Sequence, residues 1–248
     1  MYYYLNPLVL LAHKESRMTN LSLLSCSLLV LASSLSAVET TIDYTARLSV
    51  GIAKGIGLNE DDATHPKIDV TNGNILAAYI YELDPGVNLE TPVLFNFRRE
   101  GSVYVIAAPA LVYSKNKTDT KYYLINTNLG TEDTHIKDTY TQIGGKLYFG
   151  VGFGKKIGWH GELLPYVGYS RLENEKKIER SNAAGSSEKN SGSLFSYGIT
   201  AGSYYTPEFA PYLEIGGRLG FVGGQGKVGE NDVDQKGALF AFEIGTHF

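Results

Sequence analysis

The sequence has almost no cysteine: of its 248 residues, Cys26 is the only one that carries a thiol. Because Cys26 lies in an N-terminal segment that we expect to be removed, the remaining chain can form no disulfide and offers no thiol chemistry. An excess of positive charge is lacking as well, since 22 Lys and Arg stand against 26 Asp and Glu. Without a stripe of basic residues, the chain lacks the electrostatic footprint of a nucleic-acid-binding protein.

Helical patterning is also missing, because no segment repeats apolar residues at a period near 3.6 over several turns. Glycine and tyrosine are abundant instead, with 28 and 18 residues, whereas proline is scarce at 8. Tyrosine favours strands, and the apolar content is too high for a disordered chain. The composition therefore predicts an all-β protein.

The first 37 residues have the organisation of a secretory signal peptide. A short apolar and serine-rich core at 21–31 follows Lys14 and Arg17, and small residues come after it. The core is too short for a membrane-spanning helix, which needs about 20 apolar residues. We predict a cleavable signal peptide at 1–37 and one exported domain at 38–248. Met18 is an alternative start, although beginning there would remove both positive charges from the leader.

After the leader, apolar and polar residues alternate with a period of two. In 42–52 every even position is apolar, and every odd position is polar or very small. Such alternation is typical of a strand with one apolar face and one polar face. The same pattern recurs in 87–98, 142–153, 195–201, 213–221 and 240–248.

Two architectures use strands of this kind: a soluble sandwich, which turns its apolar faces inward, and a transmembrane barrel, which turns them outward to lipid. Many of the alternating runs match a tilted membrane strand of about 9–11 residues and exceed the usual strand length of about 5–6. Glycine, serine, threonine and charges of both signs occupy the polar faces. We therefore predict a transmembrane, antiparallel, up-and-down β-barrel.

Ten strands are predicted, with eight as the alternative. Their ranges are 41–54, 68–83, 87–98, 102–114, 121–129, 139–155, 162–172, 192–205, 211–222 and 236–248. Outer-membrane barrels have an even number of strands, short periplasmic turns and long outer loops. Ten strands make periplasmic turns of 84–86, 115–120, 156–161 and 206–210. The outer loops are then 55–67, 130–138, 173–191 and 223–235, together with a tight hairpin at 99–101 that breaks the length rule.

These strands resemble the small outer-membrane β-barrels of Gram-negative bacteria, a superfamily that includes the OmpA transmembrane domain, OmpX and OmpW. The resemblance covers all of 38–248 and is most specific at its end. There, Phe240, Phe242, Ile244 and Phe248 look like the signal that the barrel-assembly machinery reads in this family. The resemblance implies a monomer in the bacterial outer membrane, in contact with outer-membrane lipid and lipopolysaccharide.

Charged residues fall on the polar faces of the predicted strands, where they would line the lumen. They are Arg47, Glu90, Arg98, Lys146, Glu214, Arg218 and Glu243. One interpretation is a static interior, because buried charges must be paired. The other is a gate, in which a change of ion-pair partners opens a narrow path for water.

The segment 103–113 is apolar on both faces, unlike the other predicted strands. We interpret it as a strand whose alanines pack in the lumen, with a β-bulge at Pro109. The alternative is an apolar pocket or lateral port, which the resemblance to OmpW-like barrels implies.

The predicted loop at 171–191 carries charges of both signs. Loops are where binding residues concentrate, so Lys176, Lys177 and Arg180 are candidates for contact with lipopolysaccharide phosphates.

Signals for catalysis are weak. The histidines lack a metal-binding spacing, and none is close to a serine with an acidic partner. Asp61, Asp62 and His65 form only a loose cluster. We therefore predict no enzyme activity, no cofactor and no metal.

The sequence predicts an outer-membrane barrel with a structural or surface-interaction role, namely membrane integrity, adhesion or lipopolysaccharide contact. The alternative function is a narrow channel for small or hydrophobic solutes. A lipid-modifying barrel enzyme is a more distant third.

Overall fold

The computed structural model describes residues 40–53, 56–58, 74–83, 86–99, 102–126, 130–180 and 184–248. The predicted signal peptide at 1–37 lies outside the described residues, as do Asp61, Asp62 and His65. Within the described part of the chain, no helix is long and apolar enough to cross a membrane.

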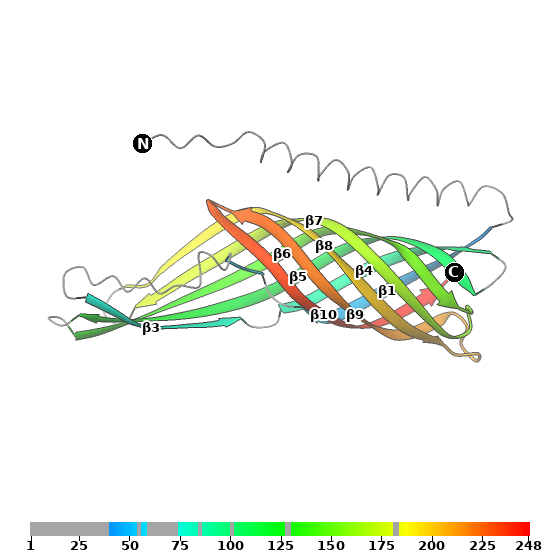
Figure 1. Cartoon of the computed structure of the whole chain (residues 1–248), viewed down its shortest axis with the longest axis horizontal. Coiled ribbons are helices and arrows are strands. Elements are labelled where there is room, and N and C mark those ends of the chain that lie inside the picture. Colours follow the sequence, from blue (N-terminus) through cyan, green and yellow to red (C-terminus); the bar gives the residue numbers. More distant parts are fainter. Residues whose placement is uncertain are drawn as a thin grey trace, which may run out of the picture. The chain divides into compact units, whose positions relative to one another are not determined.

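The regular elements among the described residues are strands, as the sequence predicts. They are β1 (Thr41–Ala53), β2 (Ile56–Leu58), β3 (Asn74–Leu83), β4 (Gly86–Arg98), β5 (Val103–Asn126), β6 (Gly130–Gly154), β7 (Gly158–Arg180), β8 (Ser186–Thr206), β9 (Leu213–Val228) and β10 (Asn231–His247). Figure 1 shows them wound around a common axis.

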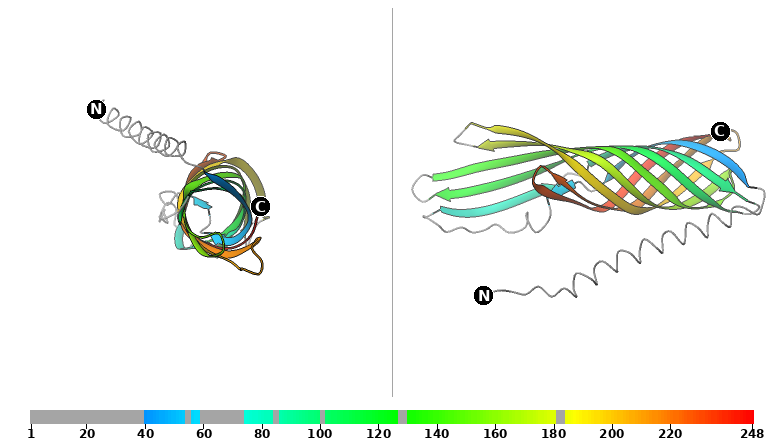
Figure 2. Two further views of the ribbon diagram at one scale, coloured as in Figure 1. Left: turned by 90° about the vertical axis from the view of Figure 1, so that its right-hand side faces the viewer. Right: turned by 90° about the horizontal axis from the view of Figure 1, so that it is seen from above.

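Eight of these strands form a closed ring. Hydrogen-bonded neighbours follow the order β1, β4, β5, β6, β7, β8, β9, β10, and β10 pairs back onto β1 in antiparallel register from Thr45–His247 to Ala53–Leu239. The end-on view in Figure 2 shows the closed ring. Closure leaves no sheet edge, which is the condition for β-structure to span a membrane.

The two remaining strands lengthen members of the ring. Strand β3 pairs with Thr118–Asn126 of β5, and β4 pairs with Tyr104–Lys115 of the same strand, so β3 and β4 follow one another along one neighbour. Strand β2 continues the line of β1 along β10, opposite Val233–Gln235. The prediction of ten strands is therefore wrong, and the alternative of eight is correct.

The error arises because two polar stretches resemble turns. The predicted turn at 115–120 reads Lys-Asn-Lys-Thr-Asp-Thr, yet it lies inside β5 and pairs with β6 from Lys115–Thr141 to Thr120–Ile136. The predicted turn at 84–86 stands where β3 gives way to β4. Most of the predicted outer loops are likewise strand, because 130–138 belongs to β6 and the greater part of 173–191 to β7 and β8.

With eight strands, 87–98 and 102–114 run opposite to the predicted direction, every strand from 121 onward keeps its predicted direction, and the connection at 99–101 changes end. It now lies at the same end as the short connections at 155–157 and 207–212, which we call the turn end. The opposite end, here the hairpin end, carries the β5–β6, β7–β8 and β9–β10 hairpins. The prediction of 99–101 as an outer hairpin is therefore wrong.

The outside of the ring is apolar and the inside is polar. Leu111 and Phe221 each expose 73% of their surface, and Trp159 exposes 71%. The outward-facing apolar residues include Ile42, Leu48, Val50, Ile52, Leu89, Val93, Ile143, Leu147, Leu163, Val167, Ile199, Leu219, Phe240, Phe242 and Ile244. A closed barrel with an apolar exterior and a polar interior is a transmembrane barrel of the outer-membrane type.

Aromatic residues mark both borders of the apolar band. At the turn end, Trp159 packs against Tyr205 with 5.2 Å between ring centroids, and Phe209 is exposed nearby in the chain. Toward the hairpin end, Tyr169 and Phe195 are exposed and directly opposite one another on β7 and β8. Such aromatic borders are typical of the two membrane interfaces.

Candidate functional site in the barrel lumen

Because apolar and polar residues alternate along each strand, the polar residues face the lumen. On β1, Thr45, Arg47 and Ser49 are buried inside, whereas Leu48 and Val50 are exposed outside. On β7 the same alternation buries every even residue from His160 to Asn174. The lumen is therefore built from every second residue of eight strands.

An ion pair crosses the centre of the lumen. Arg47 of β1 donates two hydrogen bonds to Glu162 of β7, each 2.6 Å long, and both side chains are almost fully buried. In the ring order, β1 and β7 are four strands apart, which places them on opposite walls of an eight-membered ring. The guanidinium also contacts Glu214 and lies 3.8 Å from the centre of the Tyr204 ring.

A second cationic centre lies beside the first. Arg218 of β9 is 2.8 Å from a carboxylate oxygen of Glu90 on β4 and 2.9 Å from one of Glu243 on β10. Lys146 and the Tyr148 hydroxyl also donate to Glu90. Because hydrogen bonds from two other walls meet on Glu90, this carboxylate of β4 ties β4, β6 and β9 together.

Glu243 joins the two centres into one network. Its carboxylate accepts a 2.7 Å hydrogen bond from Tyr204, contacts Arg218 at 2.9 Å and lies 3.7 Å from Arg47. Two arginines therefore share one carboxylate, which is the arrangement that an exchange of ion-pair partners requires.

Two histidines complete the network at the turn end. His160 Nε2 lies 2.8 Å from Glu214, and His247 Nε2 lies 3.4 Å from the same carboxylate. Thr45 and Thr206 hydrogen-bond to the two ring nitrogens of His247. The network holds four carboxylates and three fixed cations.

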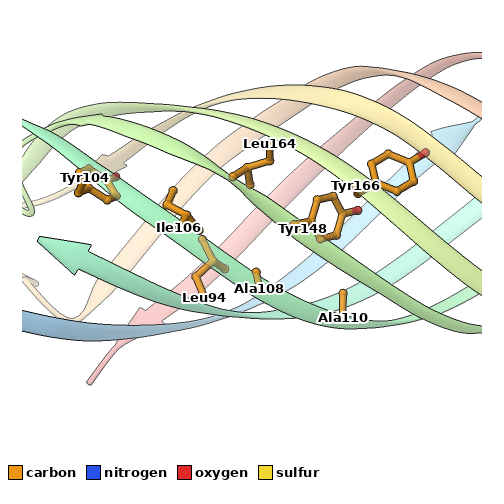
Figure 3. Close-up of a cluster of buried hydrophobic side chains, with 8 residues drawn as sticks. All are labelled: Leu94, Tyr104, Ile106, Ala108, Ala110, Tyr148, Leu164 and Tyr166. Atoms are coloured by element: carbon orange, nitrogen blue, oxygen red, sulfur yellow. The ribbon is translucent and has the colours of Figure 1, made fainter. Parts of the chain in front are cut away.

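Apolar side chains fill the space around the charges. The inward-facing cluster in Figure 3 combines Leu94 of β4, Ile106 of β5 and Leu164 of β7 with alanines and tyrosines. Ala108 and Ala110 point into it, as predicted for the apolar segment 103–113. Pro109, however, pairs with Leu147 in unbroken register, so the predicted β-bulge at Pro109 is wrong.

Inward-facing glycines make room for the lumen tyrosines. A Cβ atom on Gly216 would collide with the Tyr204 ring and with the backbone oxygen of Ser203. The tyrosine ring thus occupies the space above a position that can carry no side chain. The lumen is packed like a protein core, with its polar groups joined across the middle.

The structure places the predicted lumen residues in two groups. Six of the seven meet in the central network: Arg47, Glu90, Lys146, Glu214, Arg218 and Glu243. Arg98 lies apart, at the turn end, where it is 3.2 Å from Asp43 and stacks on Tyr104. Asp43 is also 3.2 Å from Lys156.

Sequence reasoning missed five members of the network. They are Tyr148, His160, Glu162, Tyr204 and His247. The signal was available on β7, since the outward series of Trp159, Leu163 and Val167 leaves residues 160 and 162 facing inward. For His160 it was lost because we predicted that this strand starts at 162, whereas β7 starts at Gly158.

The residues predicted to contact lipopolysaccharide lie on strand β7 and not in a loop. Lys176 is half-buried beside a cavity of about 110 Å³ that also contacts Asp138 and Glu188. Lys177 faces the other side, 3.3 Å from Glu175, and Arg180 is exposed at the end of β7. The structure therefore does not bring these three cations together.

The predicted assembly residues lie on the lipid-facing surface. Phe240, Phe242, Ile244 and Phe248 are all exposed on the outside of the barrel end. Their recognition by the assembly machinery stays a prediction.

No metal site emerges among the residues that the structure describes, because they contain no group of three His, Cys, Asp or Glu that could hold an ion.

Comparison with known proteins gives matches of structure but not of sequence. No family model and no curated protein matches the chain. Among solved structures, Ail of Yersinia pestis, bound to the heparin analogue sucrose octasulfate, aligns with a TM-score of 0.35 and 10% identity, over 84% of this chain and 99% of Ail. OprG, an outer membrane protein of Pseudomonas aeruginosa, aligns with a TM-score of 0.33 and 13% identity, over 85% and 98%. Neisserial surface protein A aligns with a TM-score of 0.30 and 13% identity, over 84% and 97%.

Proposed function

We propose that this chain is a closed outer-membrane barrel whose role is structural or adhesive at the cell surface. The observation that carries the proposal is the Arg47–Glu162 ion pair, which joins opposite walls of the lumen with two 2.6 Å hydrogen bonds. A buried ion pair is costly to break, because separating one partner leaves a charge without compensation. The barrel then contributes a stable wall and presents its hairpins to the outside.

The orientation follows from how far the strands extend beyond the ring at each end. The turn end faces the periplasm, and the hairpin end, where the chain extends furthest, faces the exterior, because outer-membrane barrels carry their long segments on the extracellular side. Strands β5 to β8 have 21 to 25 residues, against 16 and 17 for β9 and β10. The β5–β6 and β7–β8 hairpins therefore reach furthest from the ring, as Figure 2 shows, and supply the surface for contact with lipopolysaccharide or with other cells.

Conductance tests the closed lumen. Residues 38–248, refolded in detergent and inserted into a planar bilayer, are expected to give no discrete current steps. Circular dichroism confirms that the inserted protein is folded. Frequent steps from the folded wild-type protein would contradict the closed barrel.

A narrow channel is the second candidate, because Glu243 lies between Arg47 and Arg218 and can serve either of them. In a gated channel, Glu243→Gln would free the two arginines and raise the open probability. In a closed structural barrel, the same variant would lower stability and leave the bilayer silent.

A further inference from the structure

A groove on the outside of the barrel lies just beyond the aromatic border of the apolar band. On three strands the outward-facing series changes from aromatic to polar toward the hairpin end: Tyr113 is followed by Lys115, Tyr169 by Arg171, and Phe195 by Ser193. Outward residues at this level lie where lipid headgroups meet the hydrocarbon region. A ligand of this groove would therefore bind from the membrane side.

The groove has a floor of hydroxyl groups and walls of long side chains. Thr139 and Thr141 of β6 line its middle, and Lys115 of β5 stands directly opposite Thr141. On the other side, β7 contributes Arg171, and β8 beyond it contributes Lys189. The short threonines lie between longer neighbours, which leaves a cavity of about 330 Å³. That volume is at the lower end of the range for small-molecule sites.

Two of the three cations in the groove are available to a ligand. Arg171 is 3.0 Å from Glu173, and the other acidic wall residue, Glu175, is 3.3 Å from Lys177 outside the groove. Lys115 and Lys189 have no carboxylate within 4.0 Å among the residues that the structure describes. Glu173 and Glu175 thus each have another cationic partner, and Lys115 and Lys189 line the groove beside the threonines.

We propose that this groove binds the phosphorylated headgroup of a lipid in the outer leaflet. Lysine ammonium groups and threonine hydroxyls both donate hydrogen bonds to phosphate oxygens, and the charged bonds are the stronger ones. The acyl chains of the same lipid can lie along the apolar band below Tyr113 and Tyr169. The assignment rests on the proposed orientation, because only an outward-facing hairpin end places the groove in the outer leaflet. The proposed site does not use Lys176, Lys177 and Arg180, which the fold separates. It uses the cations of the groove, which lie close together.

Native mass spectrometry of the folded barrel, purified after expression of the full chain, tests the proposal. The probe is diphosphorylated lipid A, titrated against detergent-solubilised protein. Its dephosphorylated form and inorganic phosphate are run as separate arms. We expect retention of one lipid A molecule, about tenfold weaker retention of the dephosphorylated lipid, and no displacement by millimolar inorganic phosphate.

A pair of matched variants isolates the groove. Lys115→Gln with Lys189→Gln removes its two free cations. Lys227→Gln with Lys236→Gln removes two outward-facing cations of β9 and β10, which lie 3.5 and 4.0 Å from Asp232 and Asp234. We expect about tenfold weaker lipid A binding for the first double variant and unchanged binding for the second. Lys115→Arg with Lys189→Arg keeps both charges and should retain binding.

The outcomes separate the possible ligands. If both glutamine double variants lost lipid A binding equally, the effect would come from general surface charge, and the proposed site would be wrong. If inorganic phosphate displaced lipid A, the groove would be a site for free phosphate, and the proposal of a lipid ligand would be wrong. Neither result depends on conductance, so failure here is distinguishable from failure of the closed-barrel proposal.

Discussion

The two ends of strand β7 show how one backbone pattern serves two environments. Near its start, Glu162 is buried and is held by both arms of the Arg47 guanidinium. Near its end, Glu179 is exposed and has a single exposed partner, Lys137 of β6. Hydrogen bonding to β6 runs through both regions without a change of register. The backbone pairing is therefore the same in both environments, whereas the contribution of each charge to stability depends on its surroundings.

In the membrane region the outer face of the strand meets lipid, whereas in the hairpin region the outer face meets water and inner residues such as Asn174 and Asp138 stay buried. A buried ion pair is expensive to break because the remaining charge lacks solvent. An exposed pair exchanges its partner for water and loses little. The lumen network should accordingly dominate the stability of the barrel, and the hairpin charges should be free to serve recognition.

The largest expected effect comes from removing Arg47. Arg47→Met leaves Glu162 and Glu214 without their main cation inside the lumen, and it should lower the free energy of unfolding by about 3–5 kcal/mol. Chemical unfolding in lipid vesicles, followed by tryptophan fluorescence, measures the loss. The control is Lys137→Met, which removes the exposed cation of the hairpin region and should leave the unfolding midpoint nearly unchanged.

A double variant sharpens the same test. Adding Glu162→Gln to Arg47→Met removes one of the stranded charges and should recover part of the lost stability. If the single and double variants were equally unstable, packing of the arginine side chain would matter more than its charge.

The same contrast explains which parts of the fold the sequence could predict. In the membrane region, residues such as Leu48 and Arg47 differ in polarity from one position to the next, so the strands and their inward charges were predicted correctly. In the hairpin region, Lys115 and Asn116 are both polar although they face opposite sides. The period-two signal disappears there, because neither face is apolar, while the backbone pairing goes on.

The ion-pair partners of each charged residue could not be predicted from the sequence, for a different reason. Alternation tells which residues face inward but not which of them meet across the lumen. The Arg47–Glu162 pair depends on the ring order, and the predicted ten strands would have placed β1 and β7 differently. Correct pairing thus required the correct strand count.

An intermediate effect is expected from filling the space under Tyr204. Gly216→Ala places a methyl group where the Tyr204 ring now packs, and overpacking of this kind costs about 1–3 kcal/mol. The neighbouring Gly217 has its nearest contact, the Ala241 backbone oxygen, at 3.3 Å. Gly217→Ala is therefore the matched control and should be milder in the same unfolding assay. Equal effects would mean that strand propensity, and not the lumen contact, sets the cost.

The smallest expected effect is a pair of opposite titration shifts in the hairpin region. The hydrogen bond from Lys137, 2.8 Å from Glu179, lowers the pKa of that carboxyl below its ordinary value. Burial raises the pKa of Asp138, which lies next to Lys137 but on the inner face, although Asn174 donates a 3.0 Å hydrogen bond to it. Carboxyl carbon NMR of the barrel in micelles measures both values.

The two shifts act on stability in opposite senses. A lowered pKa gives Glu179 a contribution that is present above its unfolded-state pKa and is lost as pH falls through the folded-state value. A raised pKa makes Asp138 favour folding at low pH, and that contribution is lost as pH rises through its folded-state value. Lys137→Gln should return Glu179 toward its ordinary pKa and leave Asp138 shifted, and high salt should have the same selective effect, because only the exposed pair is screened. If salt moved both carboxyls equally, Asp138 would be governed by charge and not by burial, and the boundary between the two environments would lie further toward the turn end.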